Sequence, residues 1–385
     1  MPSIPTPIEN SSPTNRLAAR QRSLKEQIKT HKFNALILNP GPSLTYLTGL
    51  NFHLMERPVI AIIAPDQPIT LVIPQLEAAK TAELPFPARV FMYGEDPALW
   101  QVVFDQAARA AELEGEIGVE PTRLRYLELR LMESASAEGQ FLSAENLLAD
   151  MRVRKDSDEI ARMRKSVEIA QVGLENTLPM IRAGMTERQI AAELTLQLLR
   201  AGADTEMPFA PIVSAGPNSA NPHASPTDRP LDLGDLLVID WGAYYEGYVS
   251  DLTRTFAVGA VQAEFAHIAK IVEQSNAAGR AAAKPGVSAG SVDDAARAVI
   301  EGAGYGQFFT HRTGHGIGME GHEAPYIREG NPLILEPGMA FTVEPGIYLP
   351  QRGGVRIEDN IIVTASGADC LSSMPRQLRI VGAQA

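Results

Sequence analysis

The feature of this sequence that most restricts its fold is an internal repeat. Residues 234–244 (GDLLVIDWGAY) align with residues 338–348 (GMAFTVEPGIY) without a gap, and the alignment superposes Asp240 on Glu344. With a short gap, the next strand-like segments place Asp251 opposite Glu358. Repeated units bury their apolar faces against each other. We therefore expect two similar halves related by a pseudo-twofold axis. The four carboxylates are then expected to point into one shared cleft as two equivalent pairs.

Helices are expected in front of each repeated strand. The pattern Asp156-x-x-Glu159 is a capping box, and it begins a helix with one apolar face. The segment 182–186 then opens a helix that ends at Gly202, and in the second half the segment 284–288 opens one that ends at Gly304. The repeat and its helices indicate a duplicated α+β domain over residues 154–385.

The residues before this domain follow a different pattern. Residues 1–15 are rich in Pro, Ser and Asn and are expected to form a flexible tail, while residues 16–30 predict an amphipathic helix. Apolar runs at 35–38, 59–63 and 69–73 predict strands, and the stretch between 97 and 111 predicts a helix. This alternation indicates an α/β domain over residues 16–153. Its sequence contains no convergent cluster of His, Asp or Glu.

Length and composition agree with two domains and limit the function. The 385 residues exceed what a single hydrophobic core usually supports. The formal charge of −12 opposes a phosphate backbone, so we expect no nucleic-acid partner, whereas small or peptidic partners fit. The sequence has one cysteine, no signal-peptide pattern and no run that approaches the roughly 18 apolar residues of a membrane span. We therefore expect a cytoplasmic protein that does not contact membranes.

Four carboxylates in one cleft require a counter-charge. Like charges in a low-dielectric site repel, and divalent cations are the usual way to neutralise them. His315 lies in the run TGHGIG (313–318), whose glycines allow a bulky bound group to approach the imidazole closely. A lone histidine is more often structural, but the carboxylate pairs favour a metal ligand here. Oxygen-rich ligation with one imidazole suits Mn²⁺ or Co²⁺, with Zn²⁺ as an alternative.

Strand alternation sorts the neighbouring polar residues. Arg356 and Glu358 are expected on one face of the last repeated strand and Asp359 on the other, so Asp359 is a poor ligand candidate. Arg356 offsets the excess negative charge and is expected to orient Glu358 bidentately, or alternatively to anchor a substrate carboxylate. Thr253 shares a face with Asp251, so its hydroxyl is expected to support a ligating carboxylate.

The motifs around these residues resemble the peptidase family that includes Xaa-Pro dipeptidase (prolidase), aminopeptidase P, methionine aminopeptidase and creatinase, whose catalytic domain is a duplicated "pita-bread" fold. The matching segments are SAGPNSANPH (214–223), DWG (240–242), SDLTRT (250–255), TGHGIG (313–318), PGM (337–339), EPG (344–346) and GVRIE (354–358). The resemblance implies two divalent metal ions, which in such enzymes are most often Mn²⁺ or Co²⁺. It assigns one ion to Asp240 and the other to His315 and Glu344, with Asp251 and Glu358 bridging both.

The resemblance also implies catalytic roles. Glu344 would be the general base or proton shuttle for a metal-bridging hydroxide that attacks the carbonyl before proline. His223 and His322 would polarise the substrate and stabilise the oxyanion, with His311 in support close to His315. The expected substrate is a small proline-containing peptide, and relatives of this kind form homodimers through the N-terminal domain.

One position departs from the family pattern. Tyr326, in Glu323-Ala-Pro-Tyr, replaces the arginine of a Glu-x-Pro-Arg pattern. This argues against a direct clamp on the C-terminus of a dipeptide from this position, and Arg328 is a candidate replacement.

Several alternatives stay open. Methionine aminopeptidase usually lacks an N-terminal domain, and creatinase does not keep the metal ligands, so both are disfavoured. A peptide-binding or chaperone module on the same fold would typically have lost ligands, whereas all five are present here. The motifs are compatible with dipeptide and with longer substrates, and with any residue before the proline.

Overall fold

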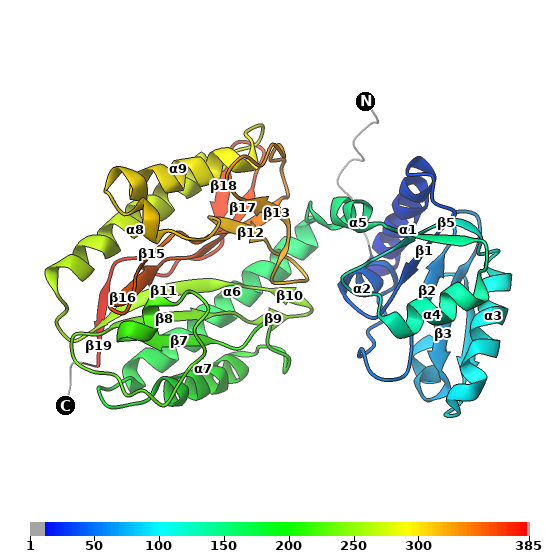
Figure 1. The fold of residues 1–385 in the computed structure, drawn as a ribbon, viewed down its shortest axis with the longest axis horizontal. Coiled ribbons are helices and arrows are strands. Elements are labelled where there is room, and N and C mark those ends of the chain that lie inside the picture. The colour runs from blue at the N-terminus through cyan, green and yellow to red at the C-terminus, as the bar shows by residue number, and fades with distance from the viewer. Residues whose placement is uncertain (1–11, 383–385) are drawn as a thin grey trace. The chain divides into compact units, whose positions relative to one another are not determined.

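The computed structural model describes residues 12–382. The chain forms two compact units, and the boundary between them along the sequence lies between Arg152 and Val153 (Figure 1). The expected fold class, an α/β unit followed by a duplicated α+β unit, is confirmed. Within the described residues, no helix combines the length and the apolar character needed to cross a membrane.

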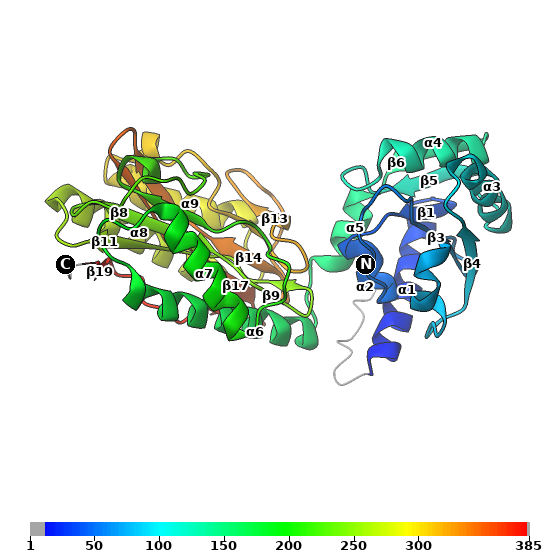
Figure 2. The same cartoon turned by 90° about the horizontal axis from the view of Figure 1, so that it is seen from below.

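The N-terminal unit is a mixed sheet with helices packed on it (Figures 1 and 2). Its strand order is β4-β3-β2-β1-β5-β6, where β1 pairs parallel to β5 and antiparallel to β2. The central strands are buried on both faces, which explains their continuous apolar runs. The elements are α1 (Pro13–Thr30), β1 (Ala35–Leu38), α2 (Pro42–Thr48), β2 (Ile60–Ile63), β3 (Ile69–Pro74), β4 (Ala88–Tyr93), α3 (Trp100–Ala110), β5 (Gly115–Val119), α4 (Tyr126–Ala135), β6 (Gly139–Ser143) and α5 (Glu145–Arg152).

The first helix begins earlier than the sequence pattern predicts. We expected a flexible tail over residues 1–15, but α1 begins at Pro13 because the Ser12 hydroxyl caps it by accepting from the Asn15 amide. Proline at the first helical position adds to this start signal. The rest of the expected tail, residues 1–11, lies outside the described residues.

The first half of the C-terminal unit packs two helices against a four-stranded sheet. The capping box of Asp156 and Glu159 is formed, and Thr186 caps the second helix, which ends at Gly202 with φ +102°. The sheet order is β19-β11-β8-β7. The elements are α6 (Ser157–Thr177), α7 (Glu187–Ala201), β7 (Ile212–Ala215), β8 (Leu236–Trp241), β9 (Tyr244–Tyr245), β10 (Tyr248–Val249), β11 (Leu252–Val258) and β19 (Arg379–Val381).

The second half repeats this arrangement. Its sheet order is β13-β12-β14-β17-β18, and Ser288 caps the second helix as Thr186 caps its counterpart. That helix ends at Gly302, two residues before the expected Gly304. The elements are α8 (Ala263–Ala282), α9 (Ala289–Gly302), β12 (Gly314–Gly316), β13 (Glu323–Ile327), β14 (Ala340–Val343), β15 (Gly346–Leu349), β16 (Gly353–Arg356), β17 (Asp359–Val363) and β18 (Ala368–Cys370).

The two halves are joined at the level of the carboxylates. In the first half β8 pairs antiparallel with β11, and in the second β14 pairs antiparallel with β17. An isolated bridge between Thr253 and Glu358 links the halves, with the Glu358 amide donating to the Thr253 carbonyl at 3.0 Å. The repeat therefore brings segments about 100 positions apart into direct contact.

Candidate metal centre

The four carboxylates occupy equivalent places in the two halves. Asp240 lies near the end of β8, and Glu344 directly follows β14. Asp251 lies in the gap between β10 and β11, and Glu358 lies in the gap between β16 and β17. We expected a continuous strand through Glu358, but it is interrupted there. The interruption frees the backbone around each of these two carboxylates from regular strand pairing.

The carboxylates and two histidines form overlapping groups whose ligand atoms all lie within 4.8 Å of one another. The three groups are Asp240 with Asp251 and Glu358, His315 with Glu344 and Glu358, and Asp251 with His315 and His322. Glu358 belongs to two groups, and so do Asp251 and His315. The side chains that the sequence predicted as ligands are thus brought together, and some of them are shared.

His315 is oriented as a metal ligand would be. Its Nδ1 lies 3.1 Å from the carbonyl of Gly316, which can only accept, so Nδ1 carries the proton and Nε2 presents a lone pair. Nε2 lies 3.3 Å from Glu344 Oε1 and 3.7 Å from Asp251 Oδ2. Burial holds the pKa of His315 well below its ordinary value, so the ring is neutral. A lone pair that faces carboxylate oxygens is favourable only when a cation lies between them.

The electrostatics of the cluster also call for cations. Burial raises the pKa of Glu358 and of Asp251 well above their ordinary values, and repulsion from neighbouring carboxylates raises both further. Burial raises the pKa of Glu344 to about 7. Asp240 Oδ1 is buried and has no hydrogen-bond partner among the described residues. Divalent ions would stabilise the ionised carboxylates, and one of them would be coordinated by this Asp240 oxygen.

Arg356 holds Asp240 rather than Glu358. Its Nη2 lies 2.6 Å from Asp240 Oδ2, so the expected bidentate pair with Glu358 is wrong. The contact to Glu358 is indirect: Thr253 Oγ1 accepts from Arg356 Nε at 3.1 Å and donates to Glu358 Oε2 at 2.7 Å. The reason is tertiary, because packing of the two halves places β8 within reach of the guanidinium.

The third guanidinium nitrogen of Arg356, Nη1, is engaged as well. Its Nη1 donates to the carbonyl of Pro222 and to the hydroxyl of Tyr348, at 3.2 and 3.0 Å. The Tyr348 hydroxyl in turn donates to His311 Nε2 at 2.8 Å, and His311 Nδ1 donates to the Arg312 carbonyl. Burial lowers the pKa of His311 to about 4, so its ring is neutral in this chain of hydrogen bonds. Four of the five N–H groups of Arg356 are thus bound to protein acceptors, so Arg356 has no pair of donors left for a bidentate bond to a substrate carboxylate.

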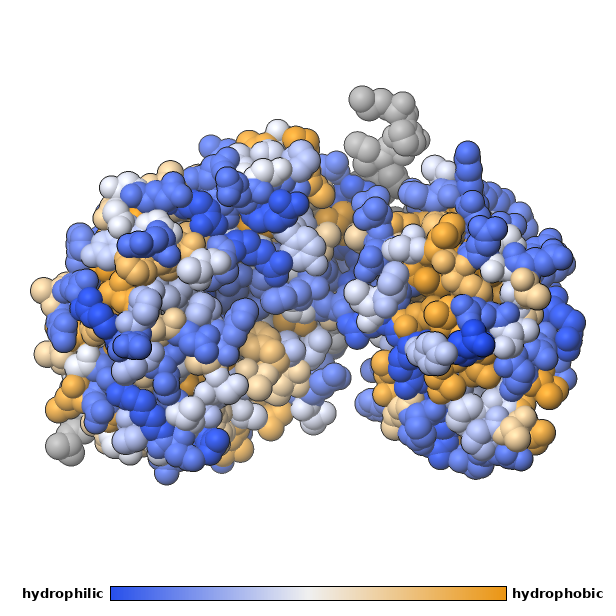
Figure 3. Space-filling view, viewed as in Figure 1, coloured by the Kyte–Doolittle hydropathy of each residue, from blue (hydrophilic) through white to orange (hydrophobic). Residues whose placement is uncertain are grey.

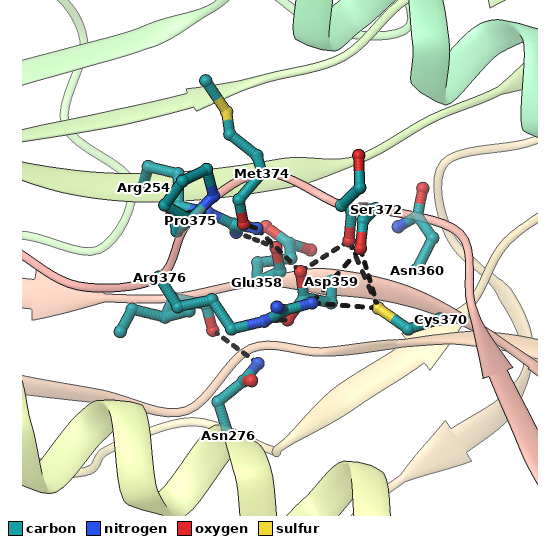
Figure 4. A network of polar contacts seen from close by, with 12 residues as sticks. Arg254, Asn276, Glu358, Asp359, Asn360, Cys370, Ser372, Met374, Pro375 and Arg376 are labelled. Atoms are coloured by element: carbon teal, nitrogen blue, oxygen red, sulfur yellow. Dashed lines mark hydrogen bonds and ion pairs between the residues drawn. The ribbon is translucent and has the colours of Figure 1, made fainter.

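A second buried arginine fixes the backbone behind the carboxylates (Figure 4). Arg254 donates to the carbonyls of Thr253 and Glu358 at 2.8 and 2.7 Å, and its Nη2 pairs with Asp359 Oδ1 at 2.8 Å. Asp359 also accepts from Arg376 Nε at 2.6 Å. Asp359 therefore points away from the metal centre, as strand alternation predicts, and its charge stabilises the arginine that holds Glu358.

Amide and hydroxyl groups fix the other ligands. The side-chain amide of Asn360 accepts from the Asp251 N–H at 3.1 Å and donates to the Asp251 carbonyl at 2.6 Å. The Thr342 hydroxyl accepts from the His315 N–H at 3.1 Å and donates to Glu344 Oε1 at 3.2 Å. Such contacts around a ligand set orient the ligands before a metal ion binds.

The three expected substrate-facing residues lie at the edge of this centre. The ring of His322 is exposed, and its centroid lies 3.9 Å from that of His315. His223 is exposed in the loop after residue 220, and its positive charge would lower the pKa of Asp240 and of His322. Tyr326 is 41% exposed, and the Arg312 guanidinium lies 4.7 Å above its ring.

Comparison with known families decides the identity of this centre. Residues 161–365, more than half of the chain, match the description "Metallopeptidase family M24", and residues 20–154 match "Creatinase/Prolidase N-terminal domain". This chain belongs to metallopeptidase family M24.

Relatives of this M24 metallopeptidase match nearly the whole chain. A Pyrococcus furiosus protein named Xaa-Pro dipeptidase is 35% identical over 82% of this chain and 88% of its own length. The crystal structure of a prolidase from Thermococcus sibiricus has a TM-score of 0.90 at 31% identity and covers 97% of this chain and 100% of its own. The structure of X-Pro aminopeptidase from Thermotoga maritima has a TM-score of 0.82 at 30% identity, with 94% and 99% covered. The chain is therefore a peptidase by family.

Sequence analysis missed several residues of this M24 centre. Tyr348 is the residue that the repeat aligns with Tyr244, and its place in the repeated motif was a signal for it. Arg254 lies inside a matched motif and Asn360 lies two residues after one, but nothing in the pattern shows that they hold the backbone of residues from the other half. Arg312 directly follows His311, and the sequence did not predict a role for it, because an arginine next to a histidine is not a recognisable motif.

Proposed function

We propose that this M24 metallopeptidase hydrolyses the peptide bond before proline in small peptides and that it uses two divalent metal ions. The observation that carries the proposal is the sharing of side chains between adjacent ligand groups. Glu358 belongs both to the group with Asp240 and Asp251 and to the group with His315 and Glu344. A carboxylate shared in this way is what a pair of neighbouring cations requires.

The residues present fit such a metal pair. A cation would satisfy Asp240 Oδ1, which has no hydrogen-bond partner among residues 12–382, and the lone pair of His315 Nε2. Asp240 would hold one ion, His315 and Glu344 the other, and Asp251 and Glu358 both. Ions bound there would lower the pKa of a water molecule and so supply a hydroxide nucleophile at neutral pH. The ligand chemistry, oxygen-rich with one imidazole, favours Mn²⁺ or Co²⁺.

The side chains of the protein would perform the proton transfers. Glu344 lies 3.3 Å from His315 Nε2, and a carboxylate at this centre can accept a proton from water and pass it to the proline nitrogen that leaves. His223 and His322 are exposed beside the centre and can donate hydrogen bonds to the carbonyl oxygen as negative charge develops on it. Arg356 would keep Asp240 in place throughout, because its donors are bound to protein acceptors.

The preference for proline is supported by the relatives. The Pyrococcus furiosus and Thermococcus sibiricus proteins are named Xaa-Pro dipeptidase and prolidase, whereas the Thermotoga maritima protein is named X-Pro aminopeptidase. These names share the bond before proline and differ in substrate length. We therefore propose Xaa-Pro cleavage for this chain, with dipeptides and longer peptides as the two substrate classes to compare.

The test is hydrolysis by the Mn²⁺-loaded full chain of Ala-Pro, Ala-Pro-Ala and Ala-Ala. We expect release of alanine from at least one proline peptide and much slower cleavage of Ala-Ala. In His315→Ala, both the bound Mn²⁺ and the rate should fall. A protein that binds Mn²⁺ but cleaves none of the peptides would support a peptide-binding module instead. Equal rates with Ala-Ala would indicate another aminopeptidase specificity.

We also propose that the chain forms a homodimer through its N-terminal unit. Apolar side chains gather near the middle of the face of this unit that Figure 3 shows. The unit exposes large apolar residues, which favour burial against a partner: Leu54, Met55, Leu76, Met92, Leu99, Val102, Tyr126 and Leu142. Light scattering should give twice the 41.6 kDa mass of the chain, and a monomer mass would contradict the proposal.

A further inference from the structure

Arg312 carries a charge that no carboxylate among residues 12–382 pairs with directly. It is half-buried in the segment between His311 and β12, and among residues 12–382 its guanidinium forms no ion pair with any carboxylate. By contrast, Arg356, Arg254 and Arg297 each have an ion-pair partner. A half-buried cation without an anion is unfavourable, so an arginine in this state calls for an external partner.

The structure holds the Arg312 side chain in place by an aromatic ring. The guanidinium lies 4.7 Å above the ring of Tyr326, which is on β13, the strand that pairs with the ligand-bearing β12. Stacking on an aromatic face keeps the guanidinium plane fixed and leaves its N–H edges free to donate. A tyrosine at this position therefore positions an arginine from the segment that precedes the neighbouring strand.

Arg312 lies close to the metal centre. It is three residues before His315, and its charge lowers the pKa of His315, of His322 and of Glu344. Glu344 and His315 are ligands in the proposed centre, and His322 is the exposed histidine beside them. The free cation and the proposed reacting bond are thus neighbours.

Resting on the proposed function, we infer that Arg312 binds the C-terminal carboxylate of an Xaa-Pro dipeptide and makes the dipeptide the preferred substrate class. In a dipeptide the free carboxylate lies one residue from the bond that is cleaved, so its binding group must lie beside the metal ligands. A planar guanidinium matches a carboxylate with two parallel hydrogen bonds. A longer peptide presents a neutral amide at the same place and leaves the Arg312 charge unmatched.

Arg312 is the best candidate for this role among the arginines near the centre. Arg356 is buried and its donors are bound to Asp240, Thr253, Tyr348 and Pro222. Arg328, the residue after β13, is exposed, and its Nη1 donates to the carbonyl of Glu329. Only for Arg312 do a fixed position, a free charge and proximity to the ligands coincide among the described residues.

The experiment compares Ala-Pro with Ala-Pro-amide, which differ only in the carboxylate, using the Mn²⁺-loaded full chain. We expect the wild type to favour Ala-Pro in kcat/KM by roughly 10- to 100-fold, the range of one charge-assisted bidentate contact. Arg312→Gln should remove most of this preference through a higher KM for Ala-Pro, with little change for the amide. Arg312→Lys should keep part of it. Inhibition by free proline should weaken in Arg312→Gln by a similar factor.

Arg328→Gln is the matched control, since it removes an exposed arginine close to Tyr326 and should leave the ratio unchanged. The inference is overturned if Arg312→Gln lowers the rate on both substrates equally, or if Arg328→Gln removes the preference instead. Because each variant is judged by the ratio of two substrates, partial loss of folded protein does not affect the result. A wild type that cleaves neither substrate overturns the proposed function itself, and with it this inference.

Discussion

The buried charge of Asp359 gives a quantitative prediction about stability. Its carboxylate is fully buried and accepts from Arg254 at 2.8 Å, from Arg376 at 2.6 Å and from the Ser372 hydroxyl (Figure 4). Although burial by itself would raise it, the two arginines hold the pKa of Asp359 at about 2, against an ordinary 3.8. This difference corresponds to roughly 2 kcal/mol in favour of the folded state at neutral pH.

Asp359→Asn should therefore destabilise the C-terminal unit by about 3 kcal/mol at pH 7. This is the lower end of the range for breaking a buried ion pair, because asparagine keeps one oxygen for Arg254. The sign of the pH dependence follows from the lowered pKa. The stabilisation from the charge is fully present above the unfolded pKa and is lost as pH falls toward 2, with roughly half gone by pH 3. The gap between wild type and variant should narrow accordingly.

The measurement is urea unfolding followed by the fluorescence of Trp241, which is buried in the C-terminal unit. Trp100 is the other tryptophan of the chain and lies in the N-terminal unit, so a Trp100→Phe background isolates the signal. Asp369→Asn is the control, since Asp369 forms an exposed pair with Arg164 that should contribute under about 1 kcal/mol. If Asp359→Asn unfolds within about 1 kcal/mol of the wild type, or if the gap does not depend on pH, the reasoning is refuted.

Three further predictions concern the metal centre and the backbone around it. Wild type should bind two Mn²⁺ per chain by calorimetry, while Glu358→Gln should bind at most one tightly, and two tight sites in the variant would argue against a shared ligand. Because burial raises the pKa of Glu344 to about 7, this carboxyl is protonated below that pH in the metal-free protein. Mn²⁺ binding should therefore release a proton, and the Mn²⁺ affinity should rise as the pH passes through about 7. An affinity that does not change between pH 6 and 8 would contradict this. Gly314→Ala should prevent normal folding, because the added Cβ would lie 1.9 Å from the Thr342 carbonyl oxygen. The control is Gly321→Ala, where the added Cβ has open space around it, and its melting temperature should equal that of the wild type.

The repeat explains why so much of the centre could be predicted from the sequence. A gapless match of residues 234–244 to residues 338–348 pairs Asp240 with Glu344, and duplicated units of this kind pack with their equivalent surfaces facing. The starts of two helices could also be predicted, because the capping boxes at Asp156 and Thr186 each involve residues only three positions apart in the sequence. The short-range prediction failed at the first helix, where Ser12 and Pro13 are start signals that an apolar pattern does not include.

What the sequence by itself determined is the set of candidate ligands, because each belongs to a local motif and the carboxylate motifs repeat. The partners of the arginines were decided only by tertiary structure. Arg356 lies two positions from Glu358, yet it pairs with Asp240, 116 positions away. Within the described part of the chain, Arg312 has no ion-pair partner, and it stacks on Tyr326 of the next strand. The physical reason is that capping and strand alternation depend on near neighbours, whereas ion pairs depend on which side chains the packing of two sheets brings within a few ångströms.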